Sequence, residues 1–337
     1  HSISSDFVRA CCEDNLGNIW IGTFNGLNRY NKSTGLFQNH TASDAQSDGL
    51  THSSIWCIVK DNQGTLWLGT YFGGVNYFNP EYEIYTRYTY SSTEPKGLSN
   101  PVVGRTIEDK DGNLWIGTEG GGLNFYNRRT REFKWFCPEN NPNSISHNNI
   151  KALYYDAAKD IIWIGTHLGG LNRLDIRTGR FTHYRMEADN PETLPSDIIR
   201  DIAPYQNYLI VATQNGVCLF NPENGKCRQL FRDTKEGKKI KMVADVTFDN
   251  NGTLWIAATG EGVFSYRFDS RKLTNYRHDS ANPNSLSNNN VNNIMQDSQG
   301  HLWFSTSGSG LDLYHPANND FENFDKEKNG LASDCVY

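Results

Sequence analysis

Acidic residues that could bind calcium stand in the run from Asp109 to Asn113, where Asp, Asp and Asn alternate with other residues. Oxygen ligands at every second position are typical of one half of a calcium loop, which also needs a distal bidentate carboxylate. The same position along the chain is occupied by turns that begin at Asp14, Asp249 and Asp297, and these keep the Asp and the Gly while the residues between them vary. Because Asp can bond its own backbone and Gly supplies a positive φ, the pattern predicts a tight turn and no metal site.

Catalytic spacings are not found. The histidines are scattered, without His-x-His or His-x-x-x-His spacing beside an acid, which argues against zinc. No Gly-x-Ser-x-Gly elbow occurs, and the Gly-Gly-Gly at 120–122 recurs as a hairpin, so it predicts no phosphate loop. We therefore expect no catalytic residue, metal or cofactor in this chain.

The candidate turns belong to a unit that recurs along the whole chain. Its most regular copy runs from Asp109 to Thr118 and continues from Gly120 to Tyr126. The marker position is occupied by Trp20, Trp67, Trp115, Trp163, Ile210 (where the Trp is lost), Trp255 and Trp303. Successive markers are 45 to 48 residues apart, and a fixed period of this size indicates a repeat architecture.

Each unit predicts four short strands. An apolar run such as 55–59 precedes the Asp-x-x-Gly turn, and Leu-Trp-Ile-Gly-Thr, rich in β-forming residues, follows it. A Gly-containing hairpin leads to a third strand, such as 169–174, and a polar turn leads to a fourth, such as 181–185, with alternating apolar and polar residues. No segment has a convincing helical period.

Seven such units predict an all-β fold, a seven-bladed β-propeller with four antiparallel strands per blade. Radial packing of the blades would bury the Trp and the aliphatic positions between neighbours. A β-helix has shorter coils, and a β-sandwich lacks such identity between its strands. The expected repeats of this single domain are 7–54, 55–101, 102–149, 150–197, 198–242, 243–290 and 291–337.

Composition limits the function further. The net charge of −6 and the absence of a basic stripe argue against nucleic acid as a partner. Lys235, Lys238, Lys239 and Lys241 cluster in what reads as a solvated loop, and no apolar run is long enough to span a membrane. The seven cysteines have no metal-like spacing, although Cys218 and Cys227 flank one hairpin and could approach each other. Whether they form a disulfide stays open.

Positions that break the repeat are the candidates for binding, because structural positions recur in every unit. Counting back five or four residues from each turn Asp gives bulky, polar positions that vary between blades and that should line one mouth of the ring. The hairpin tips, which also include Asn25, Phe72, Glu119, Gln214 and Glu261, should lie at the same mouth. Aromatic faces with Arg, Asn and His donors suit carbohydrate. The predicted site residues are Arg9, Trp56, Arg105, Lys151, Arg200, Asn292, Phe24, Tyr71 and His167; Asp245 occupies the same kind of position.

The pattern Asp-x-x-Gly-x-Leu-Trp-Ile-Gly-Thr-x-x-Gly-Gly-Leu-Asn-x-Tyr resembles the repeat of the two-component regulator propeller family. The linkers at 141–148 and 282–289 resemble the joints between blades in that family. The resemblance covers essentially the whole chain and is weak only in the fifth repeat. It implies the periplasmic sensor region of a hybrid two-component histidine kinase of the Bacteroidetes type, the extracytoplasmic part of an inner-membrane protein. The implied ligand is a glycan fragment, an oligosaccharide.

The same resemblance implies further partners: a neighbouring propeller and a β-sandwich domain in the same polypeptide, and a homodimer of the full-length protein. Signalling chemistry would reside outside these residues. The stretch Gly330 to Tyr337 matches the start of a repeat, so we expect the polypeptide to continue into another unit. Two alternatives stay open: a secreted propeller enzyme, such as a lyase or glycosidase, and a purely structural scaffold. How the ring closes is also open.

Overall fold

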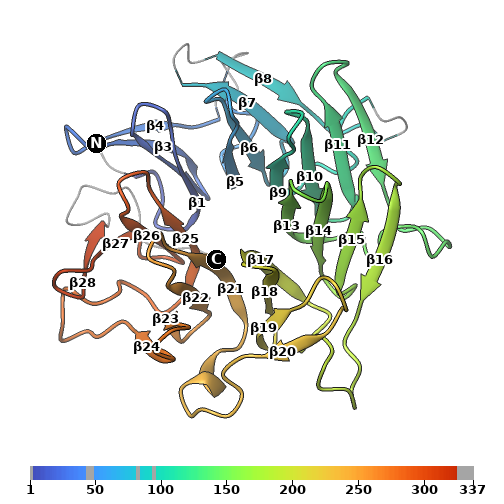
Figure 1. The fold of residues 1–337 in the computed structure, drawn as a ribbon. Coiled ribbons are helices and arrows are strands. Elements are labelled where there is room, and N and C mark those ends of the chain that lie inside the picture. The colour runs from blue at the N-terminus through green and yellow to red at the C-terminus, as the bar shows by residue number, and fades with distance from the viewer. Residues whose placement is uncertain (1–2, 43–48, 81–83, 93–95, 325–337) are drawn as a thin grey trace. The chain divides into compact units, whose positions relative to one another are not determined.

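The computed structural model of the chain describes residues 3–42, 49–80, 84–92 and 96–324. It contains seven four-stranded antiparallel sheets, and each sheet is formed by four strands that are consecutive in the sequence (Figure 1). The fold is a seven-bladed β-propeller with four antiparallel strands per blade, which confirms the predicted fold class. The chain divides into two compact units, residues 1–87 with 244–337 and residues 88–243.

The first unit holds repeats one, two, six and seven. Its strands are β1 (Val8–Glu13), β2 (Ile19–Thr23), β3 (Gly26–Asn31), β4 (Leu36–His40), β5 (Ile55–Lys60), β6 (Leu66–Thr70), β7 (Val75–Asn79), β8 (Ile84–Tyr88), β21 (Val243–Phe248), β22 (Leu254–Ala258), β23 (Gly262–Arg267), β24 (Lys272–Tyr276), β25 (Val291–Gln296), β26 (Leu302–Thr306), β27 (Leu311–His315) and β28 (Asp320–Phe324).

The second unit holds repeats three, four and five. Its strands are β9 (Val103–Glu108), β10 (Leu114–Thr118), β11 (Leu123–Asn127), β12 (Glu132–Phe136), β13 (Ile150–Asp156), β14 (Ile161–Thr166), β15 (Leu171–Asp175), β16 (Arg180–Tyr184), β17 (Ile199–Tyr205), β18 (Tyr208–Thr213), β19 (Gly216–Phe220) and β20 (Cys227–Gln229). A short 3₁₀ helix, η1 (Gly237–Lys239), forms within the lysine-rich segment that reads as a loop in the sequence.

The Asp that begins each Asp-x-x-Gly turn also binds a side chain outside the turn. In repeat three the Asp109 carboxylate accepts the backbone N–H groups of Asp111 and Asn113, while its other oxygen accepts the Trp115 indole N–H at 3.0 Å. Equivalent Asp–Trp bonds of 2.7 to 3.1 Å occur in repeats one, two, six and seven. A buried indole N–H without an acceptor is unfavourable, so the motif needs Asp and Trp six residues apart.

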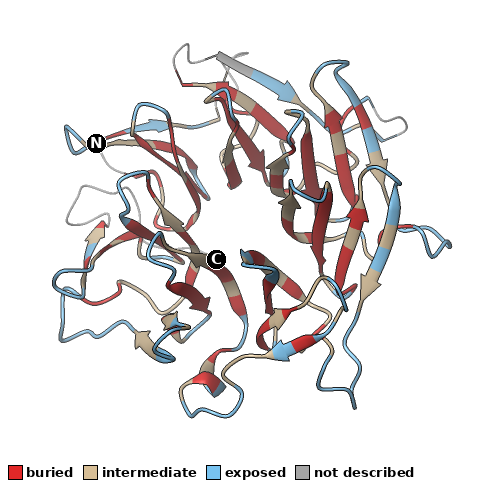
Figure 2. Ribbon diagram, viewed as in Figure 1, coloured by how far each residue is buried: buried red, intermediate tan, exposed pale blue. Residues whose placement is uncertain are grey.

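The glycine of Trp-Ile-Gly-Thr makes room for the next repeat. A Cβ added at Gly22, Gly117 or Gly165 would lie only 2.6 to 2.7 Å from the Cγ2 of an isoleucine in the first strand of the following repeat. Second strands are correspondingly buried along their length, as in β2, β10, β14 and β26 (Figure 2). The core of each unit therefore lies between neighbouring sheets, where the Trp and aliphatic side chains pack.

In repeats one to four, a buried Asn fixes the linker to the sheet that follows it. Its side-chain oxygen accepts a linker backbone N–H in Ser4–Asn28 (2.6 Å), Thr51–Asn76 (3.0 Å), Ser99–Asn124 (2.8 Å) and Ser146–Asn172 (2.9 Å). Asp312 takes this position in repeat seven and accepts from both the N–H and the hydroxyl of Ser287 at 3.0 Å. We call this hydrogen bond, from a linker N–H to the Asn or Asp of the third strand, the linker clamp. It explains the Asn that follows Gly-Gly-Leu in the repeat.

Among the described residues, no helix is long and apolar enough to cross a membrane. The match between Gly330–Tyr337 and the start of a repeat falls outside the described residues.

Candidate functional site

The predicted binding residues of the first strands sit at β-bulges. In repeats one, two, four, five and seven, the pairing of the first and second strands shifts by one residue at the second position of the first strand. The residues at these shifts are Arg9, Trp56, Lys151, Arg200 and Asn292. A bulge leaves one residue out of the ladder and re-aims its side chain, so the backbone itself separates these positions from the repeated core.

In repeat three, the strand register differs from the alignment of repeats made from the sequence. Its register shift places Gly104 at the bulge, and Arg105 pairs with Gly117, as Ala10 pairs with Gly22 in repeat one. Arg105 is therefore not equivalent to Arg9. Its Nε donates to the Lys151 carbonyl oxygen at 3.3 Å, which keeps it beside the bulge of the next repeat.

The hairpin tips are held at the same end of each sheet as the bulges. The residue that follows the second strand donates its backbone N–H to the linker just before the first strand, at about the same distance in each case. This is so for Phe24 (to Phe7, 3.0 Å), Tyr71 (to Ser54, 3.0 Å), His167 (to Asn149, 3.0 Å) and Gln214 (to Ile198, 3.0 Å). The predicted neighbourhood of tips and first strands is thus built into the fold.

An aromatic–arginine cluster, which we define as Arg9, Phe24, Trp56, Tyr71 and Phe72, forms in the first unit. The Arg9 guanidinium carbon lies 4.0 Å from the Trp56 ring centroid and 5.6 Å from that of Phe24. Trp56 stacks on Tyr71, with centroids 5.5 Å apart and planes 17° apart, and Tyr71 contacts Phe72 edge-on at 4.2 Å. Phe24 and Phe72 are 44% and 58% exposed, so the cluster offers ring surface to a ligand.

Polar groups accompany these rings. The Trp56 indole N–H is buried and has no hydrogen-bond partner among the described residues. An unpaired buried donor costs about 1–3 kcal/mol, so an acceptor brought by a ligand or water would be favoured there. The His52 ring lies 6.1 Å from Phe72, and its Nδ1 accepts the Ser54 backbone N–H at 3.0 Å.

In the second unit the corresponding positions pair with one another. The Lys151 ammonium forms a short ion pair with Glu119, and Arg200 donates to the Gln214 side-chain oxygen at 3.0 Å. Both pairs join a bulge residue to a hairpin tip. These cations and acceptors already satisfy each other, so a ligand would have to displace existing contacts.

His167 lies near the cations Lys151 and Arg200. Burial, and then the charges of Lys151 and Arg200, lower the pKa of His167, which keeps the ring neutral near pH 7. Its buried Nδ1 has no hydrogen-bond partner among the described residues. The His147 ring lies 6.3 Å away, and burial followed by the charge of His167 lowers its pKa as well.

Two predicted positions of repeats six and seven serve the joints between repeats. Asn292 donates to the Val8 carbonyl oxygen at 2.9 Å and accepts from Ser307 at 3.0 Å, so it links the last repeat to the first. Asp245 is 4% exposed and accepts the Ile294 backbone N–H at 2.7 Å, which joins repeats six and seven.

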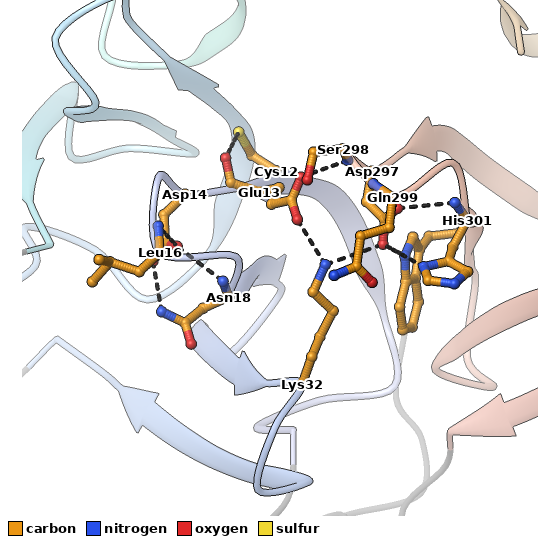
Figure 3. Close-up of polar contacts among 11 residues, drawn as sticks. Cys12, Glu13, Asp14, Leu16, Asn18, Lys32, Asp297, Ser298, Gln299 and His301 are labelled. Atoms are coloured by element: carbon orange, nitrogen blue, oxygen red, sulfur yellow. Dashed lines mark hydrogen bonds and ion pairs between the residues drawn. The ribbon is translucent and has the colours of Figure 1, made fainter. Parts of the chain in front are cut away.

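The first and last repeats meet through an ionic seam (Figure 3). Lys32 lies 2.6 Å from Glu13 and 3.3 Å from Asp297, and Glu13 also accepts the Ser298 backbone N–H at 2.6 Å. Burial alone would raise the pKa of Glu13, but hydrogen bonds from Lys32 and Ser298 bring this pKa below its usual value. Within the part of the chain that the structure describes, each of the two repeats keeps its own four strands, and side-chain and backbone contacts join them.

The carboxylate that begins the acidic turn of repeat three is already engaged by hydrogen bonds. Asp109 uses both carboxylate oxygens on N–H donors, as described above. Among the described residues, no three His, Cys, Asp or Glu side chains converge as metal ligands would.

The linker histidines were missed by sequence reasoning. His52 and His147 stand three residues before β5 and β13, and each caps the backbone N–H two residues later. Both rings face a hairpin tip. The signal was available, because this linker position varies between repeats while the residue before it is Ser or Thr in repeats one to four and seven.

Comparisons with known proteins agree with this architecture. Residues 2–25, 49–72, 97–120 and 285–308 match the sequence family described as "Two component regulator propeller". These segments contain the linker and first two strands of repeats one, two, three and seven. No curated protein matches the chain.

Solved structures with the same fold include the extracellular domain of the putative hybrid two component system BT3049 from B. thetaiotaomicron, with 21% identity and a TM-score of 0.80 over 93% of this chain and 40% of that one. A putative one component system from the same organism, BT4673, matches with 22% identity and a TM-score of 0.58 over 94% of this chain and 48% of that one. PorZ of Porphyromonas gingivalis, a component of the type-IX secretion system, matches with 17% identity and a TM-score of 0.60 over 98% and 52%. The chain spans about half the length of these structures or less.

Proposed function

Because this chain carries repeats of the two-component regulator propeller family, we propose that it is the non-catalytic, extracytoplasmic sensor region of a hybrid two-component histidine kinase and that it binds an oligosaccharide. The observation that carries the proposal is the aromatic–arginine cluster. The kinase would lie outside these residues, and the location would be periplasmic, with a companion propeller and a β-sandwich in the same polypeptide.

The chemistry of the cluster suits a sugar. Aromatic rings offer flat apolar surface to the C–H faces of pyranose rings, and the exposed Phe24 and Phe72 flank a stacked Trp–Tyr pair. Arg9 and the Trp56 N–H add donors for hydroxyl oxygens. Four of the five cluster residues are uncharged aromatics, so most of its contact surface suits a neutral oligosaccharide.

Signalling would follow from differential binding. A ligand that binds one arrangement of the domains better than another shifts the population toward it, by no more than the difference in binding free energy. In the homodimer of the full-length protein, that shift would bias the kinase.

Thermal unfolding with a panel of neutral oligosaccharides, followed by calorimetry on the hits, tests the proposal. At a hundred times its dissociation constant a ligand adds about 2.7 kcal/mol of stability. We expect a saturable shift that is lost in Trp56→Ala and kept in Tyr208→Ala, a partly exposed aromatic outside the cluster. Chromatography of the sugar separates the alternatives: a shortened product would indicate an enzyme, and no shift with any sugar would indicate a scaffold.

A further inference from the structure

Repeats five and six lack the linker clamp, and repeat five has a cysteine at the clamp position. The clamp position on the third strand is Asn28, Asn76, Asn124, Asn172 and Asp312 in five repeats, Phe264 in repeat six and Cys218 in repeat five. The linker partner has changed as well, because Pro195 stands where repeat four has Ser146. Proline has no N–H to donate, so an Asn at position 218 would have no linker partner.

A second cysteine occupies another recurrent position. Opposite the third-strand residue that lies two positions after the clamp position, the outer strand carries Phe37, Phe133, Phe181, Leu273 or Phe321. In repeat five this outer-strand residue is Cys227. Two positions that hold an amide and a large apolar side chain in most of the other repeats are thus both cysteine in repeat five.

The two sulfur atoms are in contact. The register pairs Phe220 with Cys227 and Cys218 with Gln229, so the two cysteines are diagonal neighbours on one face of the β19–β20 pair. Their Sγ atoms lie 3.5 Å apart, and the residues are 0% and 6% exposed. Trp163 and Phe220 belong to the same core cluster, which surrounds the sulfurs with apolar side chains.

Repeat five also has the weakest outer strand. β20 is three residues long, whereas the outer strands of the other repeats have five. Its marker Trp is replaced by Ile210, and the turn Asp is absent, so the Asp–Trp bond is lost too. A covalent link between β19 and β20 would compensate for these losses.

We propose that Cys218 and Cys227 form a disulfide that fastens the outer strand of repeat five. Two successive thiol–disulfide exchanges with a disulfide oxidant, such as oxidised glutathione or an oxidising protein disulfide, complete the reaction. The first thiolate attacks the oxidant, forming a mixed disulfide and releasing one thiol. The second cysteine then attacks the mixed disulfide and releases the second thiol. Each cysteine loses one proton, and the oxidant gains the two electrons. An oxidising extracytoplasmic compartment, as proposed above, would supply such an oxidant.

Burial of Cys218 and Cys227 in the core determines when the disulfide forms. A hydrogen bond to Cys227, together with burial, raises the pKa of the Cys218 thiol well above its usual value, so the native dithiol exchanges slowly. The bond therefore forms while the chain folds, before β20 covers the pair, and is afterwards protected from reductants.

The test is refolding of the reduced chain with an excess of oxidised glutathione, followed by alkylation in denaturant and peptide mapping. This readout does not depend on where the protein resides or on what it binds. We expect the peptides of Cys218 and Cys227 to be linked, leaving two fewer of the seven cysteines open to alkylation. Reduction before heating should lower the unfolding temperature by on the order of 5 °C.

Two variants complete the test. Cys218→Ala should unfold at the temperature of the reduced protein and should not respond to reductant. Cys137→Ala removes a half-buried thiol of the same unit and should keep the full response. Alkylation of all seven cysteines after refolding, or a linkage that joins other cysteines, would overturn the proposal.

Discussion

The two compact units present different chemistry at equivalent backbone positions. Bulge and tip residues of repeats one and two form an aromatic–arginine cluster whose rings are partly exposed. In repeats four and five the same positions carry Lys151 and Arg200, which already bind Glu119 and Gln214. The scaffold thus fixes where a side chain is presented, while the residue type decides whether it is open to a ligand or engaged by a neighbour.

The linker clamp differs in charge between repeats. Repeats one to four use a neutral Asn, such as Asn124 and Asn172 in the second unit, whereas repeat seven of the first unit uses Asp312, which is fully buried. Burial raises the pKa of Asp312 to about 7, although hydrogen bonds from Ser287 and Asn323 act in the opposite direction.

The largest expected effect is on the pH dependence of folding. Because the folded pKa of Asp312 exceeds the unfolded value, the folded state retains the proton longer, and its stabilisation is lost as pH rises from about 4 to about 7. The free energy of unfolding should fall by up to about 1.4 kcal/mol per pH unit in this window. Asp312→Asn, which copies the second unit, should remove that slope in urea titrations. An unchanged slope would show that Asp312 does not cause it.

The next effect concerns ligand binding. Trp56→Ala removes the ring that contacts both Arg9 and Tyr71, and we expect it to weaken binding of an oligosaccharide hit from the panel by at least about tenfold. Arg200→Ala, at the equivalent bulge of the second unit, should change the dissociation constant little. Calorimetry on both variants measures the contrast, and the reverse order would place the site in the second unit.

A smaller effect is expected at the ionic seam. Lys32→Met leaves the carboxylates of Glu13 and Asp297 without their shared cation and should lower stability by about 1–2 kcal/mol near pH 7. The seam holds the pKa of Glu13 below its usual value, so this contribution is lost as pH falls through the folded pKa. The two proteins should therefore converge in acid, as urea unfolding at a series of pH values can show. A constant difference would point to lost packing.

The smallest effect belongs to the exposed pair of Lys159 and Glu223 in the second unit, whose side chains are 47% and 74% exposed. Solvent screens such a pair, so Lys159→Ala should leave the unfolding temperature unchanged. A measurable decrease would mean that this surface contributes to folding.

Much of the fold followed from the period of the markers and the turn chemistry, because both are local. The Asp–Trp bond was not foreseen, since the turn alone accounts for the Asp. Counting back five residues from the turn Asp located Arg9, Trp56 and Lys151. In repeat three a count of four led to Arg105, whereas the strand register places Gly104 at the bulge. The contact between Cys218 and Cys227 also required the register, which sets which residues of adjacent strands share a face.

The composition of each sheet from four consecutive strands has a genetic consequence. Because no strand is shared between the described sheets, one contiguous stretch of DNA encodes one complete blade. Duplication or loss of such a stretch adds or removes a blade without leaving an orphaned strand. After duplication, the bulge and tip codons can diverge while the Asp, Trp and Gly codons stay fixed, so a new specificity can arise in one blade at a time.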